Sequence, residues 1–317
     1  MYNTAIIGAG QLGSRHLQGL KTSSLDMNIW VLDSSEESLK IAQERYEQVK
    51  PVSVKSIYYA NNLNKLPNNL DFVVIATGSK PRASIIRALL DHSTVKNLIL
   101  EKVLFPTIED YDNIAALLQS KNVNCWVNCP RRMFGYWNFV KERINPNEEI
   151  TMVQEGVNWG LCCNALHYID IFLYITGEKT CTIDTSGLIP QMIESKRSGY
   201  IEFNGTLKVK TTKGCELTLI SHPIGDANSC IEIKNGMQYF GIYEPKQIMV
   251  VNGRNISFHL PYQSELTGLL ADIVLKTGFC PLCTFEQSSA YHKTFIKVLL
   301  DYYNEVNNTN NTLLPIT

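Results

Sequence analysis

The chain has 317 residues, a formal net charge of −1, 19% charged residues and 44% hydrophobic residues. A single hydrophobic core usually stops growing at roughly 250–300 residues, so this length predicts two domains. Charges of both signs are interspersed, which excludes nucleic acid or an anionic membrane as the expected partner and favours a small molecule. No uncharged run approaches the ~20 residues that span a bilayer and no signal-like segment opens the chain, so we expect a soluble cytoplasmic protein.

The first 125 residues or so alternate short apolar runs with runs of helical periodicity. The expected strands are residues 5–7, 28–33, 71–77, 97–102 and 124–129, and the expected helices are residues 11–20, 34–49, 82–92 and 107–121. This alternation is typical of a parallel, doubly wound sheet with helices on both faces. We therefore expect an N-terminal Rossmann domain over residues 1–125.

The first expected strand leads into a glycine-rich turn, AIIGAGQLGSRHL, in which Gly8, Gly10 and Gly13 have G-x-G-x-x-G spacing. Gly8 permits a tight turn, Gly10 lets the backbone approach a pyrophosphate, and Gly13 lets the following helix pack close to the strand. The backbone amides of that helix start, including those of Gln11 and Leu12, would face the phosphates. Because the motif follows a strand and opens a helix, a dinucleotide site is favoured over a turn that binds no nucleotide.

An acidic residue, Asp33, stands twenty positions beyond Gly13, where the second strand ends. Its carboxylate would accept hydrogen bonds from the adenosine ribose hydroxyls, and its charge would repel a 2′-phosphate. NAD is therefore favoured over NADP as the cofactor. The neighbouring Ser34 and Ser35 could help to bind a 2′-phosphate, which keeps NADP open as an alternative.

Ligands of open α/β sheets collect beyond the carboxyl ends of the strands, and two such ends carry polar residues. Thr77 and Gly78 lie at the end of one expected strand, and Glu101 and Lys102 lie at the end of the next. We place Thr77, Gly78 and Glu101 on the cofactor side. A lysine at this edge would lie near the nicotinamide, where its charge can polarise a substrate oxygen. The alternative for Lys102 is a side chain that simply leaves the sheet into solvent.

The pattern changes after about residue 149, where short runs of alternating hydrophobicity are separated by turn residues. The expected strands are residues 150–159, 199–211, 215–222, 230–235 and 247–252, and the expected helices are residues 165–177, 265–278 and 285–306. Such alternation indicates a largely antiparallel sheet with one face on the core. We expect a second, α+β domain over residues 126–317.

His167 and Asp170 lie three positions apart near the start of an expected helix, so they share one face. A histidine that titrates near pH 7 can remove a hydroxyl proton as a hydride leaves the adjacent carbon. The alternative is a structural histidine held by the neighbouring carboxylate. With Lys102, these two residues are the catalytic candidates, and Asp170 would orient either the substrate or His167.

Further substrate candidates come from the segment NCPRRMFGYW and from the residues before the His167 helix. Asn128, Arg131 and Tyr136 could line a cleft, and Arg131 could bind a carboxylate or phosphate of an acidic or nucleotide-linked substrate. Alternatively, Arg131 and Arg132 pair with carboxylates of the protein. Trp159 could form a wall on which a sugar stacks, although a core tryptophan is an equal alternative.

The nine cysteines include one C-x-x-C pair, Cys280 and Cys283, with no second pair and no histidines at zinc-finger spacing. An odd number of cysteines in a chain of this size, without a secretion signal, argues against a disulfide framework. We therefore expect free thiols and no metal site.

Several segments together resemble the Gfo/Idh/MocA oxidoreductases, the family of glucose-fructose oxidoreductase and inositol dehydrogenase. They are GAGQLGSRHL, ATGSKP, EKVLFPT, HYIDIFLYITG and GLLADIVLKTGFCPLCTFEQSSAYHKTF, and they extend over nearly the whole chain. The resemblance implies a Rossmann domain followed by a domain with a large, mostly antiparallel open sheet, through which a homo-oligomer, a dimer or tetramer, would form. It also implies NAD(P)-dependent oxidation or reduction of sugars, cyclitols or their derivatives.

The resemblance extends to the catalytic candidates. The family's Glu-Lys-Pro motif is matched by Glu101 and Lys102, with Val103 in place of proline. The family's helix motif commonly reads Asp-x-Gly-x-His-x-x-Asp, and its last two defined positions are matched by His167 and Asp170.

The helix motif departs from the family at two positions, where Cys163 replaces the first aspartate and Ala165 replaces the glycine. A thiol cannot replace a carboxylate that tunes the lysine and histidine, although Asn164 beside it could bind a substrate hydroxyl. Two other classes therefore stay open. One is an NAD-binding scaffold or sensor without turnover, and the other is an NAD-dependent lyase or glycosidase that oxidises a sugar transiently.

Overall fold

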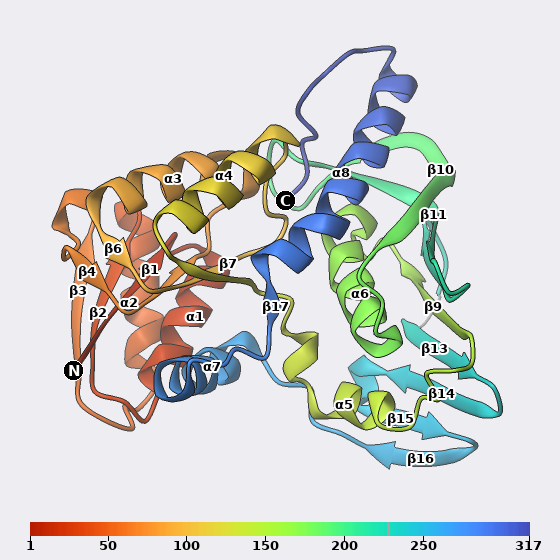
Figure 1. Cartoon of the computed structure of the whole chain (residues 1–317), viewed down its shortest axis with the longest axis horizontal. Coiled ribbons are helices and arrows are strands. Elements are labelled where there is room, and N and C mark those ends of the chain that lie inside the picture. The colour runs from red at the N-terminus through yellow and green to blue at the C-terminus, as the bar shows by residue number, and fades with distance from the viewer. Residues whose placement is uncertain (227–228) are drawn as a thin grey trace. The chain divides into compact units, whose positions relative to one another are not determined.

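The computed structural model describes residues 1–226 and 229–317 (Figure 1). The chain divides into two compact units: the first contains residues 1–105, 109–130 and 261–286, and the second contains residues 106–108, 131–260 and 287–317. This division differs from a single cut after residue 125, because residues 261–286 return to the first unit.

A seven-stranded sheet forms the centre of the first unit, in the order β17-β8-β7-β5-β1-β2-β3. Its neighbouring strands pair in parallel except at β17, which runs antiparallel to β8. The strands are β1 (Tyr2–Ile7), β2 (Met27–Leu32), β3 (Lys55–Ala60), β5 (Phe72–Ile75), β7 (Asn97–Leu100), β8 (Asn124–Val127) and β17 (Cys283–Thr284), and a small parallel ladder joins β4 (Asn69–Leu70) to β6 (Thr94–Val95). The order and direction of the strands confirm the expected Rossmann architecture.

Helices cover both faces of this sheet, which is why all residues of β5 and β7 are buried and all but Asn97 are apolar (Figure 1). One face carries α3 (Ser79–His92) and α4 (Glu109–Ser120), and the other carries α1 (Gln11–Lys21), α2 (Glu36–Glu47) and α7 (Gln263–Thr277). A short 3₁₀ helix, η1 (Leu63–Lys65), follows β3. The start of α2 is capped by Ser35, whose side chain accepts a hydrogen bond from the Ser38 amide at 3.2 Å.

The returning segment is attached to the first unit by a close approach of α1 and α7. A Cβ added at Gly268 of α7 would collide with the carbonyl oxygen of Gly19, and a Cβ added at Gly19 of α1 would lie 2.7 Å from Thr267 Cβ. Only residues without a side chain allow the two helices to pack at this distance.

The second unit is built on an eight-stranded sheet, in the order β10-β11-β12-β9-β13-β14-β15-β16. The strands are β9 (Ile150–Val157), β10 (Cys181–Glu194), β11 (Ile201–Thr211), β12 (Glu216–His222), β13 (Cys230–Asn235), β14 (Gln238–Tyr243), β15 (Ile248–Val251) and β16 (Arg254–Ser257). All neighbouring pairs are antiparallel except β9 and β12, which are parallel. The expectation of a large, mostly antiparallel sheet is therefore confirmed.

Buried and less buried positions alternate along β9 and β13, so one face of the sheet carries the core of the second unit. Helix α6 packs against β11, β12 and β9. The helices of this unit are α5 (Gly135–Lys141), α6 (Leu161–Thr176) and α8 (Phe285–Asn307), together with the 3₁₀ helices η2 (Pro130–Met133) and η3 (Glu244–Lys246). The first residue of η2 and the first two residues of α8 belong to the first unit.

We expect Gly268→Ala to destabilise the first unit by about 1–3 kcal/mol, because the added methyl group forces α7 away from α1. The matched control is Gly135→Ala at the start of α5, where an added Cβ meets no described atom within 4 Å. Urea unfolding of both variants is the measurement. Since both substitutions also gain helix propensity, a Gly268→Ala protein as stable as the control would show that the α1 to α7 contact is not tight.

Candidate functional site

The predicted cofactor residues gather at the carboxyl edge of the first unit's sheet, beginning with the glycine loop between β1 and α1. Gly8 has a φ of +92°, and a Cβ there would lie 2.8 Å from the Thr77 amide nitrogen. A Cβ at Gly13 would collide with the carbonyl oxygen of Gly8. At Gly10, by contrast, an added Cβ would meet no described atom within 4 Å. Packing therefore requires Gly8 and Gly13, whereas Gly10 borders open space.

Helix α1 begins directly after Gly10 with Gln11, Leu12 and Gly13. Within the described chain no side chain caps this start, and the first turn contains no acidic residue. The first amides of a helix have no partner inside the helix and carry the positive end of its dipole. An uncapped helix start beside open space fits the diphosphate of a dinucleotide, so the residues present here fit NAD.

The carboxylate of Asp33, just after β2, is fixed against the same loop. Its Oδ2 accepts a hydrogen bond from the Ala9 amide at 2.7 Å, and its Oδ1 accepts one from the Ser35 amide at 2.9 Å. A carboxylate oxygen can accept a second hydrogen bond, so both atoms can still receive ribose hydroxyls. Asp33 thus stabilises the loop, and its two carboxylate oxygens are the acceptors expected for the ribose hydroxyls.

Arg45 of α2 also lies beside the glycine loop, and no sequence pattern points to it. Its Nη2 donates to Gln11 Oε1 at 2.6 Å and its Nη1 donates to Ser14 Oγ at 2.6 Å. A cation is therefore attached to the first turn of α1. In the sequence, Arg45 looks like any polar residue on a surface helix.

A buried arginine joins the two loops that follow β5 and β7. Arg82 of α3 is 1% exposed and donates to the carbonyl oxygens of Thr77, Val103 and Leu104, the last at 3.0 Å. Gly78 forms the N-cap of α3 directly after Thr77. Because Arg82 satisfies backbone carbonyls on both loops, it fixes the loop at Thr77 relative to the loop that carries Lys102.

Glu101, immediately before Lys102, is 3% exposed and is held by two side chains. Its Oε1 lies 2.9 Å from His16 Nε2 and accepts a hydrogen bond from Asn128 Nδ2 at 2.5 Å. Burial raises the pKa of Glu101, but the interactions with His16, Asn128 and Lys102 outweigh it and hold the pKa below its usual range. Lys102 therefore follows a fixed, ionised carboxylate at the end of the sheet.

Helix α7 completes this buried network. His16 Nδ1 lies 2.9 Å from Thr267 Oγ1, Gln263 Nε2 donates to Thr267 Oγ1 at 3.0 Å, and Asn128 Nδ2 donates to Gln263 Oε1 at 2.9 Å. Asn128, expected as a substrate ligand, is thus buried with its amide nitrogen bound to Glu101 and Gln263. The one sign of this network in the sequence is His16, a polar residue on the apolar face of its helix.

In the second unit, the exposed face of α6 carries three polar side chains. Cys163, Asn164 and His167 are partly exposed, whereas the other residues from 161 to 173 are buried. Spacings of three and four residues place them on one face of the helix. Asn164 Nδ2 donates to the carbonyl oxygens of Trp159 at 2.8 Å and of Gly160 at 3.1 Å, which holds the start of the helix.

Trp159 is fixed just ahead of this face. Its Nε1 donates to the Ile220 carbonyl oxygen at 2.8 Å, and its ring packs edge-on against Tyr168, with 5.4 Å between the ring centroids. The side chain remains partly exposed. The position is compatible with a wall for a sugar ring, the role expected for it.

Asp170 lies on the buried side of α6 and is 0% exposed. Arg132 binds both of its oxygens, with Nε 2.9 Å from Oδ2 and Nη2 2.8 Å from Oδ1, and the Tyr291 hydroxyl donates to Oδ1 at 2.9 Å. Removing one partner of such a pair leaves the other charge buried and uncompensated. Asp170 therefore fixes the rotation of the helix that presents His167.

The neighbouring Arg131 is also bound to protein groups. It pairs with Glu244, donates to the Tyr168 hydroxyl at 3.2 Å and lies 4.5 Å from the centroid of the Tyr168 ring. The Tyr136 hydroxyl donates to Glu244 at 2.5 Å. Burial raises the pKa of Glu244, but Arg131 and Tyr136 outweigh it and hold the pKa below its usual range. The charge of Arg131 is thus neutralised by a carboxylate of the protein.

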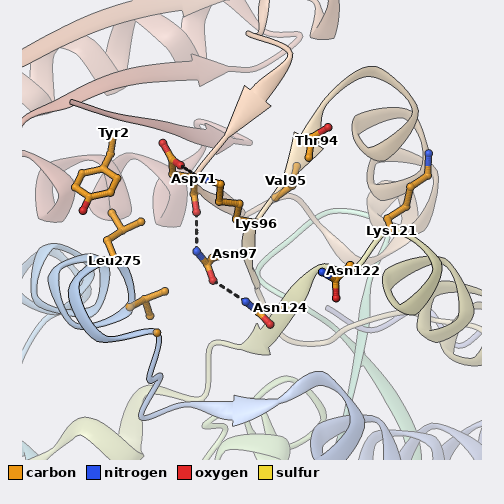
Figure 2. A pocket seen from close by; sticks show the side chains of 12 residues that line it. Tyr2, Asp71, Thr94, Val95, Lys96, Asn97, Lys121, Asn122, Asn124 and Leu275 are labelled. Atoms are coloured by element: carbon orange, nitrogen blue, oxygen red, sulfur yellow. Dashed lines mark hydrogen bonds and ion pairs between the residues drawn. The ribbon is translucent and has the colours of Figure 1, made fainter.

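Two hollows of the first unit lie apart from the glycine loop. One, of about 450 Å³, is at the amino ends of the strands, where Lys96 Nζ lies 2.8 Å from Asp71 Oδ1 and Asn97 Nδ2 donates to the Asp71 carbonyl at 2.9 Å (Figure 2). These polar groups are paired with one another. The other, of about 430 Å³, lies between the start of α2 and the end of β3, beside the stacked rings of Trp30 and Tyr58.

All nine cysteines, each within the described ranges, are free thiols, as the sequence predicts. Burial raises the pKa of the Cys280 thiol to about 12, so it is protonated at neutral pH. Among residues 1–226 and 229–317 no three histidine, cysteine, aspartate or glutamate side chains are grouped to hold a metal ion. No helix in the same ranges has the length and apolar character needed to cross a membrane.

We expect Asp170→Asn to destabilise the second unit by about 3 kcal/mol, because it leaves the Arg132 guanidinium buried without its counter-charge. The matched control is Glu216→Gln, which breaks the exposed pair between Glu216 and Lys210 and should leave the free energy of unfolding unchanged. Chemical unfolding followed by circular dichroism compares them, and equal stabilities would contradict the assigned role of Asp170.

A model of an oxidoreductase family with an NAD-binding Rossmann fold matches residues 2–129, whereas no curated protein matches the chain by sequence. Among solved structures, the UDP-N-acetylglucosamine 3-dehydrogenase GnnA from Acidithiobacillus ferrooxidans is 11% identical, with 94% of this chain and 96% of that chain covered and a TM-score of 0.69. The transcriptional regulator Gal80p from Kluyveromyces lactis is 15% identical, with 96% and 93% covered and a TM-score of 0.70. An oxidoreductase from Agrobacterium radiobacter, crystallised with NAD+, L-tartaric acid and magnesium, is 14% identical, with 97% of each chain covered and a TM-score of 0.69.

At these identities the solved structures show the shared fold, and they include both dehydrogenases and a transcriptional regulator. The family match spans the glycine loop, Asp33, Thr77 and the Glu101-Lys102 pair. The match confirms the resemblance inferred from the sequence for this part of the chain: residues 2–129 are similar to the NAD-binding Rossmann fold of the Gfo/Idh/MocA oxidoreductases.

Proposed function

We propose that this protein is an NAD-dependent oxidoreductase that transfers a hydride between nicotinamide and a CH–OH carbon of a sugar, cyclitol or sugar derivative. The observation that carries the proposal is the uncapped start of α1 beside open space at Gly10, on the same sheet edge as Lys102. The family match supports the oxidoreductase class, and GnnA, a UDP-N-acetylglucosamine 3-dehydrogenase, supports a sugar ring as the group that is oxidised.

The cofactor is held by the first unit. The amides from Gly10 to Gly13 bind the diphosphate, and the Asp33 carboxylate accepts hydrogen bonds from the adenosine ribose. Thr77 and Gly78 border the cofactor at the end of β5. NAD, when bound there, supplies the acceptor for a hydride.

Lys102 and His167 act on the substrate. In the direction of oxidation, the Lys102 ammonium polarises the substrate oxygen, and the His167 imidazole takes the hydroxyl proton as the hydride leaves the adjacent carbon. The O–H and C–H bonds break and a carbonyl group forms. Asp170 contributes indirectly, since its pair with Arg132 orients the helix that carries His167.

The charges around α6 favour a neutral polyol over an acidic substrate. Arg131 is paired with Glu244 and Arg132 is paired with Asp170, so neither guanidinium is available to a substrate carboxylate or phosphate without giving up a buried partner. Asn164 and Trp159 then supply a hydroxyl partner and a stacking wall. A neutral sugar or cyclitol fits these residues of the second unit best.

A second candidate function, an NAD-binding regulator without turnover, is supported by one observation. The first turn of α6 contains Cys163 and no acidic residue, so this helix does not supply the carboxylate that the family motif has there. Gal80p, a transcriptional regulator, shares the fold.

Cofactor choice is tested by fluorescence titration with NADH and NADPH. We expect tighter binding of NADH, and we expect Asp33→Ala to weaken it and to shift the preference toward NADPH, because the charge that repels a 2′-phosphate is lost. Asp33 also accepts a hydrogen bond from the Ala9 amide, which supports the glycine loop. Asp33→Asn keeps an acceptor for that bond and removes only the charge, so comparing the two variants distinguishes the effect of the charge from the effect of the loop. If neither nucleotide binds the wild-type protein after bound cofactor has been removed, the cofactor site is wrong.

Catalysis is tested by turnover on a panel of neutral sugars and cyclitols. Lys102→Met and His167→Ala are each expected to lower kcat by about 10²–10⁴-fold with NADH binding retained, because each removes a group that acts on the reacting oxygen. Lys96→Met, at the opposite edge of the sheet, is the control and should keep full turnover. Full turnover in both active-site variants would refute the assignment, and tight NADH binding without turnover on any substrate would favour the regulator.

A further inference from the structure

The first turn of α6 is held by a buried carboxylate that comes from another element. Glu202 of β11 is 5% exposed. Its Oε2 accepts a hydrogen bond from the Cys162 amide at 2.7 Å, and its Oε1 accepts one from the Cys163 amide at 3.1 Å. The N-cap residue of α6, Gly160, has no side chain that could do this. The orphan amides of this helix start are therefore satisfied by a strand of the sheet below it.

The backbone before α6 leaves room for this approach. Gly160 has a φ of +75°, and a Cβ added there would lie 3.4 Å from Glu202 Oε1 and 3.2 Å from Asn164 Nδ2. The carboxylate and the Asn164 amide group thus flank the same glycine. Both are packed against the residues that begin the exposed face of α6.

The groups around Glu202 are cysteine thiols and amides. Burial raises the pKa of Glu202, and hydrogen bonds from Cys163 and Cys162 oppose that rise. Burial and the Glu202 charge together raise the pKa of the Cys162 thiol. The other ionisable neighbours of this turn are His167, one turn further along α6, and Tyr302 of α8, which faces Cys162.

We propose that Glu202 is a positioning residue that supplies, from β11, the negative charge that α6 lacks at position 163. It binds the amide of Cys163 itself, so a carboxylate is present at the turn where the helix sequence has a thiol. It fixes the face formed by Cys163, Asn164 and His167, and it offsets the positive end of the helix dipole beside that face. This inference rests on the proposed function, because the face is taken to contact the substrate.

One consequence can be measured without any substrate. Amides at the start of a helix favour a thiolate, and Glu202 opposes this effect by occupying them and adding a negative charge beside Cys163. Glu202→Gln keeps the volume and removes the charge. We expect the pH profile of iodoacetamide alkylation at Cys163, followed by mass spectrometry, to move to lower pH in this variant.

The chain provides its own controls for that measurement. Cys181 of β10 and Cys230 of β13 are also partly exposed, and their alkylation profiles should not move. A faster reaction at Cys163 with an unchanged pH midpoint would mean only that the helix start has opened, and it would overturn the proposal. An unchanged profile at Cys163 would overturn it as well.

Turnover gives the second readout. We expect Glu202→Gln to lower kcat by about tenfold or more with NADH binding unchanged, and Cys163→Asp in the same chain to restore part of that loss because it returns a carboxylate to the turn. Glu216→Gln, an exposed position on β12, should leave kcat unchanged. Full kcat in Glu202→Gln, or no rescue by Cys163→Asp, would overturn the proposal. A wild-type protein without turnover would refute the proposed function, but the alkylation experiment would still test the effect of Glu202 on Cys163.

Discussion

The buried carboxylate of Glu101 is the interaction on which the candidate cofactor edge of the first unit depends. A charge with 3% exposure is tolerated only when its partners are in place, and here they are His16 on α1 and Asn128 after β8. Thr267 and Gln263 of α7 in turn bind His16 and Asn128. Loss of one side chain would leave the remaining buried groups without a hydrogen-bond partner, so the network acts as a unit. It fixes the residue before Lys102, and so links the packing of α1 and α7 to the carboxyl edge of the sheet.

The second unit obeys the same constraint with different residues. Asp170, Glu202 and Glu244 each accept charge-assisted or amide hydrogen bonds in largely buried positions. Asp170 lies on α6 itself, Glu202 binds the first turn of α6, and Glu244 binds Arg131, which donates to Tyr168 of α6. Their common effect is to fix a helix whose buried face is apolar and whose remaining face carries Cys163, Asn164 and His167. Specific orientation of that face comes from the carboxylates, since apolar packing alone tolerates rotation and sliding.

Much of the fold could be predicted because its signals are local. Buried parallel strands read as apolar runs, and the glycine loop reads as a motif whose steric reasons recur in the structure at Gly8 and Gly13. Strand β10 was not expected, because register shifts on either side of Gly187 and Leu188 break the alternation along it. The return of residues 261–286 was not expected either, since nothing in a helical pattern reveals that Gly268 packs on Gly19 of a distant helix.

The site residues divide in the same way. Lys102, Asp33 and His167 can be proposed from the sequence, because each lies at an expected strand end or on an expected helix face. Glu202, Arg82 and Arg45 cannot be, because each acts on backbone or side chains far away in sequence. Position 163 is an example. The helix motif lacks a carboxylate there, whereas in the fold Glu202 of β11 places a carboxylate beside the same turn. A substitution within a motif therefore removes a function only if no neighbouring strand restores the charge, and that depends on tertiary packing, which a single sequence does not display.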